Sequence, residues 1–249
     1  QALAATVPAL AAAPMAANPV PGGRRLRIGV ARDRAFGFYY PDDLAALQAA
    51  GGELVFIDTL SDTRLPVLDG LFIGGGFPEM HMEALQANGA LRAALREAIA
   101  GGLPVYAECG GLMYLSRRLR WKDRVAEMVG AIPADAVMHE RPVGRGYVAL
   151  RETADFPWPG GEAALIRAHE FHHSSLENLG PGLRFGYRVE RGQGIDGQHD
   201  GLLCGHVLAS YAHRHSSGAD GWAPRFVAYV RGIAAVRDAA AASRCGVAA

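Results

Sequence analysis

The residues with the clearest chemical potential are those around Cys109, in the sequence AECGGL. An apolar run before them, at 104–106, predicts a strand, and residues 112–115 predict a helix. A cysteine at such a joint lies in a tight turn, and the first helical turn offers unpaired N–H groups and a positive dipole end that favour the thiolate. Gly110 and Gly111 permit close backbone approach. The pattern predicts a nucleophile elbow with Cys in place of Ser; a buried, inert cysteine is the alternative.

A glycine loop at 74–76 follows another apolar run and could present backbone N–H groups to an anion. A phosphate is disfavoured, because the chain has no G-x-x-x-x-G-K-[ST] motif and the loop lacks the spacing of a dinucleotide fingerprint. In a cysteine enzyme, Gly75 and Gly76 would instead supply one oxyanion donor and the N–H of Gly110 the other. A tight loop without function is the alternative.

Two histidines, His213 and His215, follow the strand-like residues 207–209. A cysteine hydrolase needs a histidine to take and return a proton, and a histidine just past a strand end suits that role. Both side chains point the same way in an extended segment, so spacing alone does not choose between them. An exposed pair without function is the alternative.

The segment 169–173 (HEFHH) formally matches H-E-x-x-H, the zinc protease signature. That chemistry requires His169 and His173 on one face of a helix, with a third ligand elsewhere. The residues before them do not decide between helix and strand. We therefore expect a substrate-facing or structural polar cluster with no metal, and keep a zinc hydrolase as an alternative.

The elements that position these residues follow from apolar runs and glycine-marked turns. The runs of the first half predict buried strands at 25–31, 53–57, 70–73 and 103–107, and helices at 42–50 and 91–100. This alternation predicts an α/β fold with a mostly parallel central sheet flanked by helices. Shorter segments of the second half predict added antiparallel strands at 146–151, 164–169, 185–190 and 201–208, and a last helix at 221–238.

The composition narrows the class of protein. The chain has 249 residues, of which 50% are hydrophobic, and a formal net charge of zero. Nucleic acid and membranes are therefore disfavoured as partners, and no run approaches the length of a membrane-spanning helix. Cys109, Cys204 and Cys245 are too few and too scattered for a disulfide framework, which with no secretory signal indicates a reducing cytoplasm.

The two ends of the chain differ from the rest in composition. The first residue is Gln1 rather than methionine, which indicates part of a longer or processed chain. The stretch 1–23 is mostly Ala and Pro without a basic leader, so we expect a linker or tail and not a signal peptide. We expect one domain at 24–238 and a flexible, Ala-rich tail at 239–249.

Five segments carry a family resemblance, and they occur in order at 32–40, 74–79, 107–115, 169–172 and 208–213. Together they resemble the glutamine amidotransferase half of the cobyrinate a,c-diamide synthases, which belong to the class I (triad-type) glutaminases. The similarity runs from about Arg25 to Tyr229. It implies the class I glutamine amidotransferase fold, which is flavodoxin-like.

The resemblance implies that Cys109 attacks the side-chain amide of glutamine, giving a glutamyl thioester and ammonia, with His213 as general base and acid. The loop with Gly75 and Gly76, together with Gly110, would stabilise the oxyanion. In the family, a second domain uses this ammonia, ATP and Mg²⁺ to amidate a tetrapyrrole-derived acid bound at the domain interface. Members act on corrinoids such as cobyrinate or hydrogenobyrinate, and related ones on sirohydrochlorin or sirohaem-type rings. A homodimer is compatible with the resemblance.

Two departures from the family pattern matter. The ATP-binding half should carry a phosphate loop, and this chain has none. This implies that the chain itself holds no cofactor and supplies ammonia to an ATP-dependent synthetase domain or subunit. The wider class has a glutamate two residues after the catalytic histidine, where this chain has His215 in a His-x-His pattern that the diamide synthases share. Glu170 is then a candidate for orienting His213.

Three other functions stay open. The first is a sirohydrochlorin or sirohaem-type amidase of the same family. The second is a non-catalytic domain that docks to a synthetase. The third is the zinc hydrolase that would use His169 and His173.

Overall fold

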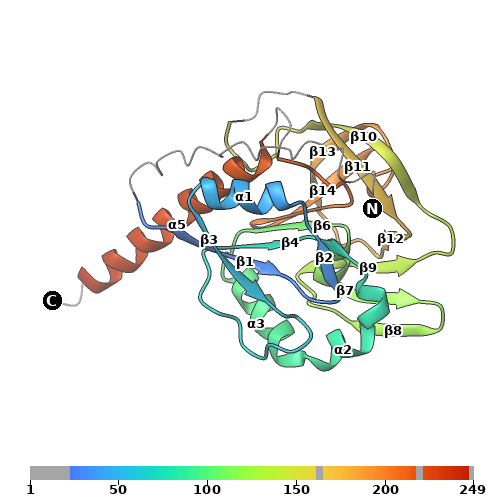
Figure 1. Ribbon diagram of the computed structural model, residues 1–249, viewed down its shortest axis with the longest axis horizontal. Helices are drawn as coiled ribbons and strands as arrows, with labels where there is room; N and C mark the ends of the chain where they lie inside the picture. The colour runs from blue at the N-terminus through green and yellow to red at the C-terminus, as the bar shows by residue number, and fades with distance from the viewer. Residues whose placement is uncertain (1–22, 161–164, 217–220, 247–249) are drawn as a thin grey trace, which may run out of the picture.

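The computed structural model describes residues 23–160, 165–216 and 221–246, whose arrangement Figure 1 shows. A nine-stranded sheet runs through this part of the chain, in the order β11-β10-β13-β14-β15-β6-β4-β1-β3. The parallel strands are β1 (Leu26–Ala31), β3 (Gly52–Ile57), β4 (Gly70–Ile73), β6 (Val105–Glu108) and β15 (Val207–Ser210). The antiparallel strands are β10 (Gly144–Glu152), β11 (Leu165–His172), β13 (Arg184–Arg191) and β14 (His199–Cys204). The predicted α/β fold with added antiparallel strands is confirmed.

Helices cover both faces of the parallel half, whose inner strands are apolar on both sides. On one face lie α1 (Pro41–Ala49) and α5 (Trp222–Gly246), over an aromatic cluster that includes Phe72, Tyr106 and Trp222. The other face carries α2 (Met82–Ala87), α3 (Gly89–Ala100) and α4 (Gly110–Leu115). Figure 1 shows these two groups on opposite sides of the sheet. The strand ends are thereby fixed from both faces.

A smaller four-stranded sheet follows α4 in the chain. Its strands, in spatial order, are β12 (Ser174–Glu177), β9 (Ile132–Met138), β7 (Ser116–Trp121) and β8 (Arg124–Glu127). The strands between 116 and 138 are not predicted from the sequence. The reason is visible in β7, where the buried Leu119 stands among three arginines, so that the short segment shows neither an apolar run nor a regular alternation.

A short antiparallel ribbon completes the fold beside the parallel strands. It pairs β2 (Phe36–Phe38) with β5 (Gly75–Gly76), and the 3-10 turn η2 (Pro78–His81) follows it. A side chain at Gly76 would collide with the carbonyl oxygen of Ala35, so this pairing requires glycine. The ribbon holds the glycine loop in place at the end of β4.

The chain ends differ in part from expectation. Helix α5 continues to Gly246, past the predicted end at Asp238, and so occupies most of the segment predicted as a flexible tail. Alanine is the strongest helix former, which explains the extension through the Ala-rich stretch. Residues 1–22 of the predicted linker lie outside the described residues. No helix in the described segments is long and apolar enough to cross a membrane.

Asp69 ties the first strand to the last helix. Its carboxylate accepts hydrogen bonds from Arg24 (2.5 and 2.8 Å), from Arg237 (2.7 Å) and from the backbone N–H of Arg27 (2.9 Å). These contacts, the Arg24 hydrogen bond foremost, lower the pKa of Asp69 below its ordinary value. The carboxylate is buried, whereas both arginine side chains are about half exposed. Solvent screening therefore limits what the ion pairs contribute to the free energy of unfolding.

Asp69→Asn is expected to lower the free energy of unfolding by about 1–2 kcal/mol at pH 7. A carboxyl with a lowered pKa stabilises the fold above its ordinary pKa of about 3.9 and loses that contribution as the pH falls through its folded value. The difference between wild type and variant should therefore shrink in acid. Urea unfolding across pH measures it, with Asp238→Asn, at the exposed carboxylate beside Arg24, as the control. Equal stability of wild type and Asp69→Asn at pH 7 contradicts the prediction.

Candidate active site

Cys109 lies at the joint between β6 and α4, as the sequence predicted. Its backbone has φ 47° and ψ −99°, a conformation that residues with a side chain rarely adopt and that costs of the order of 1–3 kcal/mol. The neighbouring strand holds it there, because the N–H of Cys109 donates to the carbonyl of Ser210 in β15 (2.8 Å). The carbonyl of Cys109 accepts from the N–H of Met113 (3.1 Å) and begins the helix. This is the backbone of a nucleophile elbow.

The two glycines after Cys109 are required by close packing. A side chain at Gly111 would collide with the carbonyl oxygen of Ile73 in β4. At Gly110, a Cβ would lie 2.9 Å from the backbone nitrogen of Gly76. The glycine loop and the start of α4 therefore adjoin next to Cys109. A Cβ at Gly75 would lie 2.6 Å from Cε1 of His213, so the same loop also contacts the histidine.

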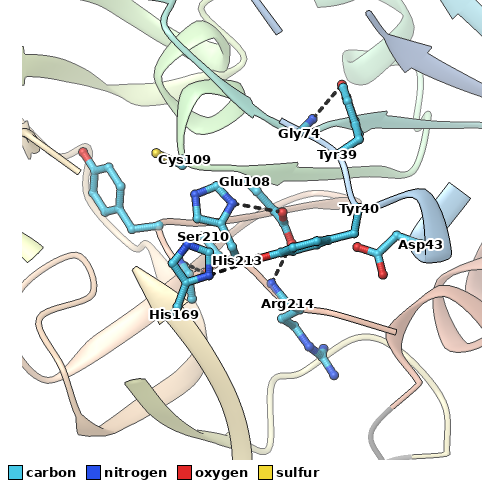
Figure 2. Close-up of polar contacts among 12 residues, drawn as sticks. Tyr39, Tyr40, Asp43, Gly74, Glu108, Cys109, His169, Ser210, His213 and Arg214 are labelled. Carbon is cyan, nitrogen blue, oxygen red and sulfur yellow. Dashed lines mark hydrogen bonds and ion pairs between the residues drawn. The ribbon is translucent and has the colours of Figure 1, made fainter. Parts of the chain in front are cut away.

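His213 reaches Cys109 from the segment that follows β15. Figure 2 shows its imidazole between the sulfur of Cys109 and the carboxylate of Glu108. Nδ1 of His213 lies 3.3 Å from Oε2 of Glu108, and both side chains are buried. Backbone hydrogen bonds in both directions with His169 of β11 fix the position of His213 (2.7 and 3.2 Å). Cys109, His213 and Glu108 thus form a triad.

Glu108 is the residue that the sequence analysis missed. It ends β6, and its Oε1 accepts from the hydroxyl of Tyr106 (2.6 Å) and from the N–H of Arg214 (3.1 Å). A buried carboxylate is tolerated only when hydrogen bonds and a cation compensate its desolvation. The signal was present in the sequence, since Glu108 is a charged residue at the end of an apolar strand and directly precedes the nucleophile.

The environment of His213 favours its charged form. Burial by itself lowers the pKa of His213, but the hydrogen bonds and negative charge of Cys109 and Glu108 outweigh burial and raise the pKa to about 10. These contacts favour the protonated form of the imidazole, which faces the cysteine sulfur. A charged imidazole beside the sulfur stabilises a thiolate, the form of cysteine that acts as a nucleophile.

Asp200 holds the segment that carries His213. This fully buried carboxylate accepts from Ser210 Oγ (2.7 Å) and from the N–H groups of Tyr211 (3.0 Å) and Ala212 (3.1 Å). Burial raises the pKa of Asp200, while these hydrogen bonds act in the opposite direction. The segment leaves β15 in a single conformation as a result.

His215 and Glu170 lie away from the reactive sulfur. Nε2 of His215 is 3.8 Å from a carboxylate oxygen of Asp42, and its ring packs on Tyr40, so His213 and not His215 faces Cys109. The suggestion that Glu170 orients His213 is wrong. Its carboxylate instead accepts the N–H groups of Gln193 (2.7 Å) and Gly194 (2.8 Å) and lies beside His172.

The H-E-x-x-H match is not a zinc motif in this fold. Residues 169–172 belong to β11, and His173 lies in the bend that follows, so the helical spacing that zinc requires is missing. The rings of His169 and His213 stack at 4.9 Å, whereas that of His173 packs against Phe171. The strand assignment removes the basis for the zinc hydrolase.

A cavity of about 80 Å³ opens at Cys109. It is lined by Gly76, Phe77, Glu79, Cys109, Met113, Met138, Phe171, His172 and His173. Glu79 in η2 is a second residue that sequence reasoning missed as part of the site. Its side chain is buried and forms no salt bridge with another described residue, and His173 on the same cavity interacts with it electrostatically. Burial raises the pKa of Glu79 above its ordinary value.

Comparison with known proteins gives this geometry a family context. The domain family described as "CobB/CobQ-like glutamine amidotransferase domain" matches residues 27–220. A "Cobyrinate a,c-diamide synthase" of Magnetococcus marinus is 50% identical over 206 residues, which cover 83% of this chain and 44% of that protein. One from Archaeoglobus fulgidus is 43% identical over 81% of this chain and 43% of its own length. The chain thus spans less than half the length of these relatives.

Solved structures share the fold. A crystal structure of a glutamine amidotransferase superposes with a TM-score of 0.58 at 18% identity, covering 84% of this chain and 98% of that one. At this identity the likeness concerns the arrangement of the strands and helices alone.

The pKa of His213 is directly measurable. In wild type, the imidazole should titrate near pH 10. Cys109→Ala should lower this pKa by at least about one unit, because only Glu108 then offsets the lowering of the pKa by burial. NMR of ¹³C-labelled histidine reports the titration. Cys204→Ala, at a cysteine that hydrogen-bonds Ala131 instead, is the matched control and should leave His213 unchanged. An unchanged His213 pKa in Cys109→Ala argues against the coupling.

Proposed function

Since the chain belongs to the CobB/CobQ-like glutamine amidotransferase family, we propose that it hydrolyses glutamine through a thioester at Cys109 and supplies the ammonia for amidation of a carboxylate. The observation that carries the proposal is the buried triad of Cys109, His213 and Glu108 at a nucleophile elbow. Cysteine, an adjacent base and a group that orients the base are the parts that acyl transfer from an amide requires.

Acylation begins with attack of the Cys109 sulfur on the side-chain amide carbon of glutamine. The carbon–sulfur bond forms, and the N–H groups of Gly110 and of the glycine loop around Gly75 and Gly76 stabilise the oxyanion. The charged imidazole of His213 donates its proton to the departing nitrogen. The carbon–nitrogen bond then breaks, which releases ammonia and leaves a glutamyl thioester.

Deacylation uses the same histidine as a base. Once the sulfur is in a thioester, it no longer raises the pKa of His213, so burial shifts the imidazole towards its neutral form. Neutral His213 takes a proton from water as the oxygen attacks the thioester carbon. The carbon–sulfur bond breaks, glutamate leaves, and Cys109 recovers. Glu108 acts as a positioning residue, because its contacts hold the ring in one orientation throughout.

Glu79 gives the pocket a means to recognise the amino-acid end of glutamine. Its carboxylate lies in the same cavity as Cys109, and free glutamine carries an α-ammonium group. A buried carboxylate that forms no salt bridge with the described residues gains a charge-assisted hydrogen bond when such a group binds. Glu79 would thereby favour free glutamine over an amide that lacks the ammonium group.

The acceptor is inferred from the relatives. Their name, cobyrinate a,c-diamide synthase, supports a corrinoid carboxylate as acceptor, with sirohydrochlorin or sirohaem-type rings as the alternative within the family. ATP and Mg²⁺ would act in a synthetase domain or subunit, because this chain has no phosphate loop. Homodimer formation and a cytoplasmic location stay predictions from the sequence.

A silent docking domain is the competing function. Ammonia release from glutamine by this chain, assayed alone and with the synthetase part of a relative added, distinguishes the two. Glutamine hydrolysis in either condition supports the glutaminase, whereas none in both contradicts it.

Cys109→Ala is expected to reduce ammonia release from glutamine by about 10³-fold or more, since no other group can form the thioester. Cys204→Ala is the control and should keep wild-type activity. Diazo-oxonorleucine, a glutamine analogue that alkylates nucleophiles, should modify Cys109 and spare Cys204 and Cys245 by mass spectrometry. Persistent hydrolysis in Cys109→Ala would rule out the thioester.

Glu79→Gln is expected to raise KM for glutamine about tenfold, because a charge-assisted hydrogen bond to the ammonium is lost. Glutaramate, which has the same amide and carboxylate but no α-ammonium group, should react equally well with both proteins. Glu83→Gln, at an exposed carboxylate paired with Arg124, is the matched control. Equal losses for glutamine and glutaramate would mean that Glu79 supports the pocket and does not read the ammonium.

A further inference from the structure

A second, much larger cavity lies on the other side of His213. Its volume is about 760 Å³, and it is lined by Tyr40, Tyr147, Val148, Ala149, Leu165, Arg167, Ala168, His169, Arg191, His213 and His215. Cys109 is not among these residues and opens instead into the small cavity. The imidazole of His213 therefore belongs to the wall of the large cavity while its reactive partner faces the small one. Figure 2 shows Tyr40 and His169 on this side of the ring.

The antiparallel strands build the floor of this cavity. Val148 and Ala168 of β10 and β11 are buried in the core beneath α5. Their neighbours in sequence face outward, because side chains alternate along a strand. Ala149 is paired with Arg167 of β11 on one side and with Arg191 of β13 on the other. A small residue between two long ones leaves a hollow with a guanidinium on each side.

The charge of this hollow is positive. Among the described residues that line it there is no Asp or Glu, and neither Arg167 nor Arg191 forms an ion pair with another described residue. Arg188, nearby on β13, differs in this respect, since it forms a salt bridge with Glu190. Two arginines that face a cavity together, without acidic partners, suit the carboxylates of a bound molecule, because a guanidinium binds a carboxylate through two parallel hydrogen bonds.

The remaining lining is apolar or aromatic. Tyr147 and Leu165 are 79% and 43% exposed, although they are large hydrophobic side chains at the edge of the sheet. The volume of about 760 Å³ lies within the range of small-molecule sites, which combine apolar walls with a few charged groups. A ligand with an apolar body and several carboxylates would match both parts of this surface.

We propose that this cavity binds the carboxylate-bearing acceptor, a small organic polyacid with an apolar ring system, with Arg167 and Arg191 as its carboxylate ligands. The inference rests on the proposed function for the identity of the acceptor. It adds that the glutaminase chain itself holds part of the acceptor, beside the histidine at which ammonia is released. Binding here would keep acceptor carboxylates next to the ammonia source.

The test is equilibrium dialysis of cobyrinate against this chain, without ATP or a second domain. Wild type should bind cobyrinate, and the double variant Arg167→Gln/Arg191→Gln should bind at least about tenfold more weakly. The control double variant Arg118→Gln/Arg184→Gln removes the same charge from exposed arginines elsewhere and should bind like wild type. Fully methyl-esterified cobyrinate keeps the ring but not the charges and should bind at least about tenfold more weakly than the acid.

Three results would overturn the inference. They are no binding of cobyrinate by wild type up to its solubility, equal weakening in both double variants, and equal binding of acid and ester. Circular dichroism and the thermal midpoint of each variant show that the fold is intact. Glutamine hydrolysis by the same wild-type preparation, assayed alone and with the synthetase part of a relative added, separates the two proposals. Cobyrinate binding with hydrolysis in neither condition contradicts the glutaminase and keeps the site, and hydrolysis without cobyrinate binding does the reverse.

Discussion

The pairing of β6 with β15 is the interaction on which the site depends. These two strands are parallel neighbours in space, although about a hundred residues separate them in the chain, and their register sets Ser210 opposite Glu108. Both strands therefore end at the same edge of the sheet. The nucleophile follows one strand, the histidine follows the other, and the Ser210 carbonyl holds the strained backbone of Cys109 through one hydrogen bond. A shift of one residue in this register would turn Glu108 to the opposite face of the sheet.

Two buried carboxylates stabilise this arrangement. Glu108 and Asp200 lie on strands on either side of β15, and each accepts backbone N–H groups from the segment that carries His213. Removing one partner of such a network is costly, because the other buried polar groups are then left without hydrogen bonds. The network therefore holds His213 in position, and Glu108 within it acts together with Cys109 to raise the pKa of His213 against the effect of burial.

The antiparallel half of the sheet gives His213 two different surroundings. On one side are the sulfur of Cys109 and the small cavity that contains Glu79. On the other side are His169 and the large cavity with Arg167 and Arg191. The backbone pairing of His169 with His213 joins the added strands to the parallel core at this point. The nucleophilic sulfur and the hollow with its two arginines thus lie on different sides of His213.

The sequence by itself determined the local chemistry. The elbow at Cys109, the need for glycine at Gly110 and the alternating strands of the first half follow from residue types over a few positions, because they are short-range effects of backbone sterics and apolar patterning. Only the tertiary structure shows that His213 and not His215 faces Cys109. It also shows that the carboxylate beside His213 is Glu108 and not Glu170, and that the H-E-x-x-H match lies in a strand. Those questions concern which side chains face each other across strands, and that is set by sheet order and register, to which distant segments contribute equally.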